Sequence, residues 1–152
     1  MIKVLFVCHG NICRSTMAEF VFKAMITKAG LQDKFYIASA GTSTEELGNP
    51  VHPGTRKKLA EHGINCAGKY AVQITKADYD KYDYILGMDS QNIKNMNRIF
   101  DGNPDNKVKL LLEYTGESVD IADPWYTGDF EATYRDVLRG CTALLENIKK
   151  ND

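Results

Sequence analysis

The sequence lacks long hydrophobic runs and a clear excess of either charge. Residues 2–7 are too short for the apolar region of a signal peptide, and no run approaches the length of a membrane span. Its 19 basic and 20 acidic residues give a net charge of -1, so no global field attracts nucleic acid or anionic lipid. We therefore expect a cytoplasmic protein without nucleic-acid or membrane partners, in which any affinity for anions comes from a local site.

Patterns of metal ligands are also absent. The four cysteines comprise one C-x4-C pair followed by the isolated Cys66 and Cys141, without the paired C-x2-C spacing of zinc sites. The three histidines are scattered along the chain. We expect no metal and no cofactor. In a reducing compartment the four cysteines are expected to be free thiols, and Cys66 and Cys141 to be core residues.

Repeats, low-complexity tracts and linkers are missing as well, so the 152 residues are expected to form one domain, 1–152. Short apolar runs alternate with segments of helical periodicity, which predicts an α/β fold. We expect a single-domain, doubly wound sheet of about four parallel strands with helices on both faces. The expected strands are 3–7, 35–39, 84–88 and 107–112. The expected helices are 15–28, 53–62, 75–81, 90–100 and 130–148.

Several features of these helices can be predicted in more detail. Thr75 and Ser90 are expected to be N-caps, and His62 with Gly63 to end the second helix. A long Gly/Ser/Thr/Pro-rich loop, 40–53, precedes that helix. The first helix should bury its apolar stripe of Met17, Ala18, Phe20, Val21, Ala24 and Met25. The stripe expected in the last helix is Tyr134, Val137, Leu138, Cys141, Leu144, Leu145 and Ile148.

The stretch VLFVCHGNICRST, residues 4–16, joins the first strand to the first helix. Ligands of parallel sheets bind beyond the carboxyl ends of strands, where this turn lies. A glycine-bearing turn that leads into a helix presents backbone N–H groups and the positive end of the helix dipole, a match for phosphate. Arg14 adds a planar guanidinium that can bind two phosphate oxygens. Asn11 tolerates the left-handed backbone that such a turn requires.

Cys8 begins the same turn, at the base of the expected anion site. A helix N-terminus and a nearby arginine stabilise the thiolate form of a cysteine. A thiolate beneath a bound phosphate is placed for in-line attack on phosphorus, which yields a phosphocysteine that water must hydrolyse. Ser15 can donate a hydrogen bond to this thiolate or brace the turn. The residues of the turn, His9, Gly10, Asn11, Ile12 and Cys13, are expected to bind the phosphate together with Ser15.

Departure of an ester oxygen requires a proton donor, and the best candidate is Asp123 in IADPWY. Pro124 stiffens this loop, and Trp125 and Tyr126 offer aromatic walls for an aryl group. Asp-Pro also starts ordinary turns, so the local sequence alone leaves that simpler reading open. Two other functions are open too, namely a phosphocarrier that passes its phosphate to a partner and a non-catalytic phosphate-binding module. His9 beside Cys8 does not favour a Cys–His protease, because adjacent extended residues face opposite sides.

CHGNICRS followed by DPWY resembles the low-molecular-weight protein tyrosine phosphatase family. SAGT, the HGI at 62–64 and TKADYDKYDYILGMD occur in the order found in that family. The resemblance implies a single phosphatase domain that hydrolyses protein phosphotyrosine and small aryl phosphates and releases inorganic phosphate. The active chain is expected to be a monomer without a metal. By position, the resemblance makes Cys8 the nucleophile, Arg14 the phosphate clamp and Asp123 the general acid and then base.

Further roles follow from the same resemblance. Cys13 would be a neighbouring thiol that forms a reversible disulfide with Cys8 under oxidation. Asp89 would brace the phosphate loop. Trp125 and Tyr126, with the loop around Glu45 and Glu46, would form the rim that meets the substrate. Some members of the family have an aromatic residue where this chain has Glu45-Glu46, and an acidic pair there should disfavour acidic flanking residues.

Two departures from related sequences also matter. Val72 stands where the family has an arginine, so a basic anchor for the neighbouring loop is missing. The middle of the chain lacks the cysteine pair of the related arsenate reductases, which argues against arsenate reduction.

Overall fold

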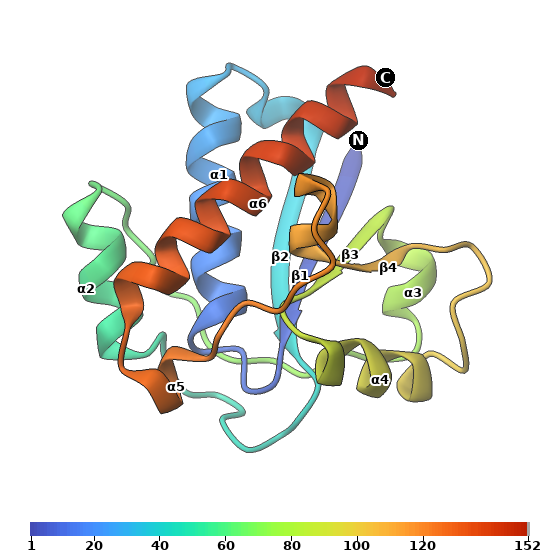
Figure 1. Cartoon of the computed structure of the whole chain (residues 1–152), viewed down its shortest axis with the longest axis horizontal. Coiled ribbons are helices and arrows are strands. Elements are labelled where there is room, and N and C mark those ends of the chain that lie inside the picture. The colour runs from blue at the N-terminus through green and yellow to red at the C-terminus, as the bar shows by residue number, and fades with distance from the viewer. Residues whose placement is uncertain (152) are drawn as a thin grey trace.

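A computed structural model of the chain describes residues 1–151 and shows an α/β fold (Figure 1). The sheet in this part of the chain is four-stranded, with the order β2-β1-β3-β4 and parallel pairing throughout. The strands are β1 (Ile2–Cys8), β2 (Phe35–Gly41), β3 (Tyr84–Gly87) and β4 (Val108–Leu110). The predicted fold class is confirmed. The carboxyl ends of the strands meet along the lower edge of the sheet in Figure 1.

The sheet is covered on both faces, which explains why β1 is apolar almost throughout. On one face, Val4 and Phe6 pack against α1 (Arg14–Lys28) and α6 (Phe130–Lys150). α2 (Pro53–Glu61) adds Leu59 to the same core. On the other face, Leu5 and Val7 pack with side chains of α3 (Asp78–Lys81) and α4 (Ser90–Ile99). A strand with two covered faces has no position for a polar side chain.

α1 differs from the predicted stripe because it is buried on more than one side. Residues 14–19, Phe22 and Ile26 are buried, whereas Ala24 is exposed. The helix lies between the sheet and α6, with α2 beside it (Figure 1), so its polar positions near the N-terminus are enclosed as well. Leu138 of α6 is also exposed, while the other residues predicted for that stripe are buried or half-buried.

Other predicted boundaries are corrected by the structure. The strand expected at 107–112 ends at Leu110, and the next residues form the 3-10 helix η2 (Leu111–Thr115), which packs on α6. α3 begins only at Asp78, so Thr75 is not its N-cap; the Thr75 N–H instead binds the Asp78 carboxylate. Asp89, rather than Ser90, caps α4. Two short helices were not predicted, η1 (Gln32–Lys34) and α5 (Pro124–Thr127).

Glycine at one position of β2 allows the sheet to approach the turn after β1. A Cβ atom at Gly41 would lie 2.8 Å from the His9 carbonyl oxygen, a distance that side chains do not tolerate. The Gly41 N–H and carbonyl also pair with Val72 and Ile74. The turn therefore rests directly on backbone, and the segment after residue 70 is fixed beside it.

Candidate active site

The turn between β1 and α1 forms a loop whose carbonyl groups are held from outside. The carbonyl oxygens of Cys8, His9 and Ile12 accept hydrogen bonds from the backbone N–H groups of Thr42, Ser43 and His52, at 2.9, 3.1 and 2.9 Å. Among residues 1–151, no acceptor is found for the backbone N–H groups of residues 10–14. These donors, at the N-terminus of the 15-residue helix α1, are available to an anion. Asn11 has φ 60°, the left-handed conformation predicted for it.

A buried hydrogen-bonded chain supports Cys8 from behind the loop. The Cys8 Sγ and Ser15 Oγ atoms lie 3.0 Å apart. The Asn11 amide donates to Ser15 Oγ at 2.8 Å and to Ser39 Oγ at 2.9 Å. The Ser39 hydroxyl in turn donates a hydrogen bond to the Glu19 carboxylate at 2.5 Å.

The directions of these bonds leave one hydroxyl proton of the chain, that of Ser15, without an assigned acceptor. The Ser39 hydroxyl has one proton and uses it in the hydrogen bond to Glu19, so toward the Asn11 amide it can only act as an acceptor. Ser15 likewise accepts from Asn11 and keeps its own proton. Ser15 Oγ accepts from the Cys8 thiol here, and the same hydroxyl can turn to donate to the sulfur if Cys8 is ionised.

Arg14 is buried, with 3% of its side chain exposed. Its guanidinium donates to Asp89 Oδ2 at 2.7 Å and to the Ile121 carbonyl at 2.9 Å, and it lies 3.4 Å from Asp123 Oδ2. Burial opposes its charge, but Cys8, Asp89 and Asp123 together raise the pKa of Arg14 above its usual value. The guanidinium is therefore a permanently charged group, fixed by two aspartates and facing the same pocket as Cys8.

Asp123 is positioned by the start of α5. It is the N-cap residue, and its Oδ1 accepts from the Trp125 N–H at 3.0 Å. His52 links this loop to the phosphate loop. The His52 ring contacts the rings of Trp125 and Phe130, with centroids 5.5 and 5.3 Å away. The backbone N–H of His52 donates to the Ile12 carbonyl.

The rim around the pocket is aromatic on one side and acidic on the other. Trp125 and Tyr126 are 55% and 83% exposed. His9 Nε2 lies 2.9 Å from Glu45 Oε2, and Glu46 accepts from the Asn49 amide at 2.6 Å. A bound aryl group would thus lie between flat rings and carboxylates.

A cavity of about 110 Å³ gathers nearly all of the residues predicted for the site. Its lining comprises Cys8, His9, Gly10, Ile12, Cys13, Arg14, Glu45, Glu46, Asp123, Trp125 and Tyr126. The buried side chains of Asn11 and Ser15 point behind the loop rather than into the cavity. Sequence reasoning missed Glu19, Ser39 and His52. Ser39 belongs to the SAGT segment, but neither its spacing nor that of Glu19 indicates that they meet behind the loop.

Cys13 and Val72 can also be compared with their predicted roles. Burial, followed by the nearby Cys8 and Asp123, raises the pKa of Cys13 to about 12, so its thiol is neutral at pH 7. The predicted lack of a basic anchor is made good by Lys69, which donates to the Ser39 carbonyl at 2.8 Å, while the Val72 N–H donates to Asn11 Oδ1 at 3.0 Å. Asp89 is only half-buried, but it contacts Arg14.

Residues 1–151 contain neither a cluster of metal ligands nor a helix that could span a membrane. The side chains of His, Cys, Asp and Glu form no group of three or more that could hold a metal ion. None of the helices in this range has the length and apolar character needed to cross a membrane.

Known proteins resemble this chain in sequence and in structure over nearly its whole length. The family model described as low molecular weight phosphotyrosine protein phosphatase matches residues 3–152. The low molecular weight protein-tyrosine-phosphatase YfkJ of Bacillus subtilis is 42% identical over 152 residues, which cover 99% of this chain and 97% of YfkJ. The crystal structure of YfkJ superposes with a TM-score of 0.96, covering 100% of this chain and 97% of that one.

Two relatives of lower identity also match along nearly the whole chain. The low molecular weight phosphotyrosine protein phosphatase of Sus scrofa is 40% identical over 153 residues, 96% of this chain and 95% of the pig protein. The crystal structure of DARP, a Drosophila arginine phosphatase, is 33% identical with a TM-score of 0.88, covering 99% of this chain and 100% of that chain.

Proposed function

The chain belongs to the low molecular weight phosphotyrosine protein phosphatase family, whose members are phosphomonoester hydrolases, and on this basis we propose that it hydrolyses protein phosphotyrosine and small aryl phosphates through a phosphocysteine on Cys8. The observation that carries the proposal is the position of the buried Arg14. Its guanidinium lies between Asp89 and Asp123 and faces the cavity that Cys8 also lines.

In the first step, the Cys8 thiolate attacks phosphorus, an S–P bond forms and the bond to the ester oxygen breaks. Arg14 and the N–H groups of residues 10–14 bind the equatorial oxygens, where negative charge must be stabilised. Asp123, in its protonated form, gives its proton to the departing oxygen, so the alcohol leaves neutral.

In the second step, water attacks the phosphorus of the phosphocysteine. The Asp123 carboxylate takes a proton from this water, the S–P bond breaks, and inorganic phosphate and the Cys8 thiolate are released. The Ser15 hydroxyl, 3.0 Å from Cys8 Sγ, stabilises the departing thiolate. The cycle returns every group to its starting state and needs no metal.

Turnover of p-nitrophenyl phosphate in reducing, metal-free buffer tests this mechanism. Cys8→Ser is expected to abolish turnover, and Asp123→Ala to slow it by about two to four orders of magnitude, the usual contribution of a general acid. A chain that is labelled once by a phosphodonor and then stalls would be a phosphocarrier. A chain that binds phosphate without turnover would be a binding module. Either result would overturn the proposal.

The substrate class can be tested in the same assay. We propose phosphotyrosine because Trp125 and Tyr126 provide exposed rings at the rim. Since one structural relative, DARP, is an arginine phosphatase, phosphoarginine is the natural competitor. Trp125→Ala should raise KM for a phosphotyrosine peptide several-fold, because a stacking surface is lost. A higher kcat/KM for phosphoarginine than for phosphotyrosine would contradict this assignment.

A further inference from the structure

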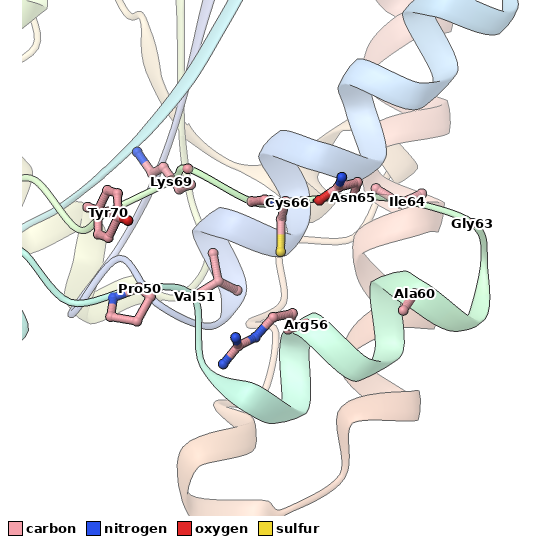
Figure 2. A pocket seen from close by; sticks show the side chains of 12 residues that line it. Pro50, Val51, Arg56, Ala60, Gly63, Ile64, Asn65, Cys66, Lys69 and Tyr70 are labelled. Atoms are coloured by element: carbon pink, nitrogen blue, oxygen red, sulfur yellow. Dashed lines mark hydrogen bonds between the residues drawn. The ribbon is translucent and has the colours of Figure 1, made fainter.

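A second cavity, of about 500 Å³, lies between α2 and the segment 63–70, apart from the residues that line the active site (Figure 2). Its volume is within the range of small-molecule sites. Its walls mix apolar groups, such as Val51, Ile64 and the exposed ring of Tyr70, with a few polar ones.

The two charged residues that line this cavity are basic, although the Lys69 ammonium is directed out of it toward β2 and Glu19. Arg56 and Lys69 line it, and the described lining contains no aspartate or glutamate, although the chain has 20 acidic residues. Within residues 1–151, no ion pair of Arg56 with a carboxylate is found. Figure 2 shows Arg56 extending from α2 toward Val51 and Pro50, with the Cys66 sulfur turned to the same space. Arg56 can therefore pair with an anion that enters there.

The wall of the cavity is connected to the phosphate loop at two points. Lys69 turns its ammonium toward β2 (Figure 2), where it donates to the Ser39 carbonyl at 2.8 Å and lies 3.6 Å from Glu19 Oε1. Three residues farther on, the Val72 N–H donates to Asn11 Oδ1 at 3.0 Å. Both connections converge on Asn11, because Ser39 accepts from the Asn11 amide.

From these observations we propose that the cavity between α2 and segment 63–70 is a regulatory site for a small organic anion with a flat apolar body. A carboxylate would bind Arg56, and its apolar body would lie against Val51 and Tyr70. The side chain of Asn11 already has both donors and its acceptor engaged, so a ligand that displaces the segment can only weaken those bonds. The proposal is that occupancy shifts segment 63–70 in this way and thereby lowers the rate of catalysis. The inhibitory effect rests on the proposed role of Cys8, whereas binding to the cavity does not.

Binding can be measured by NMR titration of the ¹⁵N-labelled chain with 2-naphthoate, with the active site saturated with vanadate. We expect saturable amide shifts in residues 63–70 and α2. Arg56→Gln should weaken binding about ten-fold, the loss of one charge-assisted pair. Lys57→Gln is the matched control, since it removes a neighbouring exposed cation of α2 that does not line the cavity, and it should change the dissociation constant less than two-fold. Shifts confined to the active-site loops, or equal weakening in both variants, would overturn the proposal.

Inhibition is measured as kcat for p-nitrophenyl phosphate at saturating substrate, where a competitor at the active site has no effect. In the wild type, 2-naphthoate should lower kcat at least two-fold, and Arg56→Gln should shift this effect to about ten-fold higher concentration. Unchanged kcat at a concentration that saturates the NMR shifts would refute the regulatory role. Absence of turnover without the probe would instead contradict the proposed function, so the two failures can be distinguished.

Discussion

Asn11 is the residue on which the shape of the phosphate loop depends most. It combines a left-handed backbone, φ 60°, with three side-chain hydrogen bonds, to Ser15, Ser39 and the Val72 N–H. Asparagine is among the few residues other than glycine that adopt this conformation readily. Backbone geometry and the support of Cys8 therefore come from one side chain.

Two substitutions separate these roles. Asn11→Gly and Asn11→Ala both remove the three hydrogen bonds, so both should lower kcat/KM at least ten-fold. Only alanine adds the strain of a left-handed backbone, roughly 1 kcal/mol, which should lower its melting temperature by about 2–4 °C relative to the glycine variant. Thermal unfolding by circular dichroism measures the difference. Equal melting temperatures would mean that the loop relaxes out of the left-handed region.

Cys13 is a buried thiol close to Cys8 and Asp123. Its neutrality at pH 7 follows from burial and from the charges of Cys8 and Asp123. Oxidation of Cys8 would remove one of those charges and make Cys13 easier to ionise. The reversible disulfide between the two stays a prediction.

Helix starts are the elements that build the site. Asp89 caps α4 by accepting from the Asn92 N–H with Oδ1, and its Oδ2 accepts from Arg14. Asp123 similarly caps α5 with Oδ1 and faces Arg14 with Oδ2. Each carboxylate uses one oxygen for a helix and the other for the guanidinium, so the two helices fix the orientation of Arg14.

Asp89→Asn tests this division. An amide has one oxygen, so it can cap α4 or accept from Arg14, but not both. Asparagine is as good an N-cap as aspartate, so we expect little change in melting temperature. The loss of the charged partner of Arg14 should lower kcat/KM about ten-fold. Asp120→Asn is the control, because Asp120 also binds the start of α4, through the Ser90 N–H, without contacting Arg14. A similar loss of activity in both variants would contradict the argument.

At the scale of the whole molecule, buried thiols and phenols link stability to pH. Burial raises the pKa of Cys141 above its ordinary value of 9.0, and burial also raises the pKa of Tyr114 to about 12. Above pH 9 the unfolded chain therefore releases protons that the folded chain keeps. The stabilisation is complete below pH 9 and is lost as the pH rises through the folded pKa values.

We expect the free energy of unfolding in reducing urea to fall steeply above pH 9. Each buried thiol contributes about 1.4 kcal/mol per pH unit there. Cys141→Ala should reduce that slope by about this amount, whatever it does to stability at pH 7. Unfolding curves between pH 7 and 10.5 give both slopes, and identical slopes would show that Cys141 is not kept neutral by folding.

Patterns along the chain were sufficient to predict the sheet and the residues of the pocket. They did not predict the buried hydrogen-bonded residues behind the loop. The buried run Val4–Val7 and the turn that follows it are local signals, and the DPWY motif is specific. Glu19 meets Ser39 because α1 crosses β2, a tertiary contact that no local period encodes. Leu111 and Leu112 fit a strand by composition, but packing against α6 makes them helical.

The double use of Asp89 and Asp123 also constrains how such a protein can diverge. A mutation of either aspartate to a residue that cannot cap a helix is penalised twice, once in folding and once in catalysis, because the same carboxyl group serves both. For such substitutions, drift in the chemistry of this site cannot be separated from drift in its architecture. Lineages that abandon the reaction would still retain a capping residue, aspartate or asparagine, at these two positions as long as the helices they begin are needed.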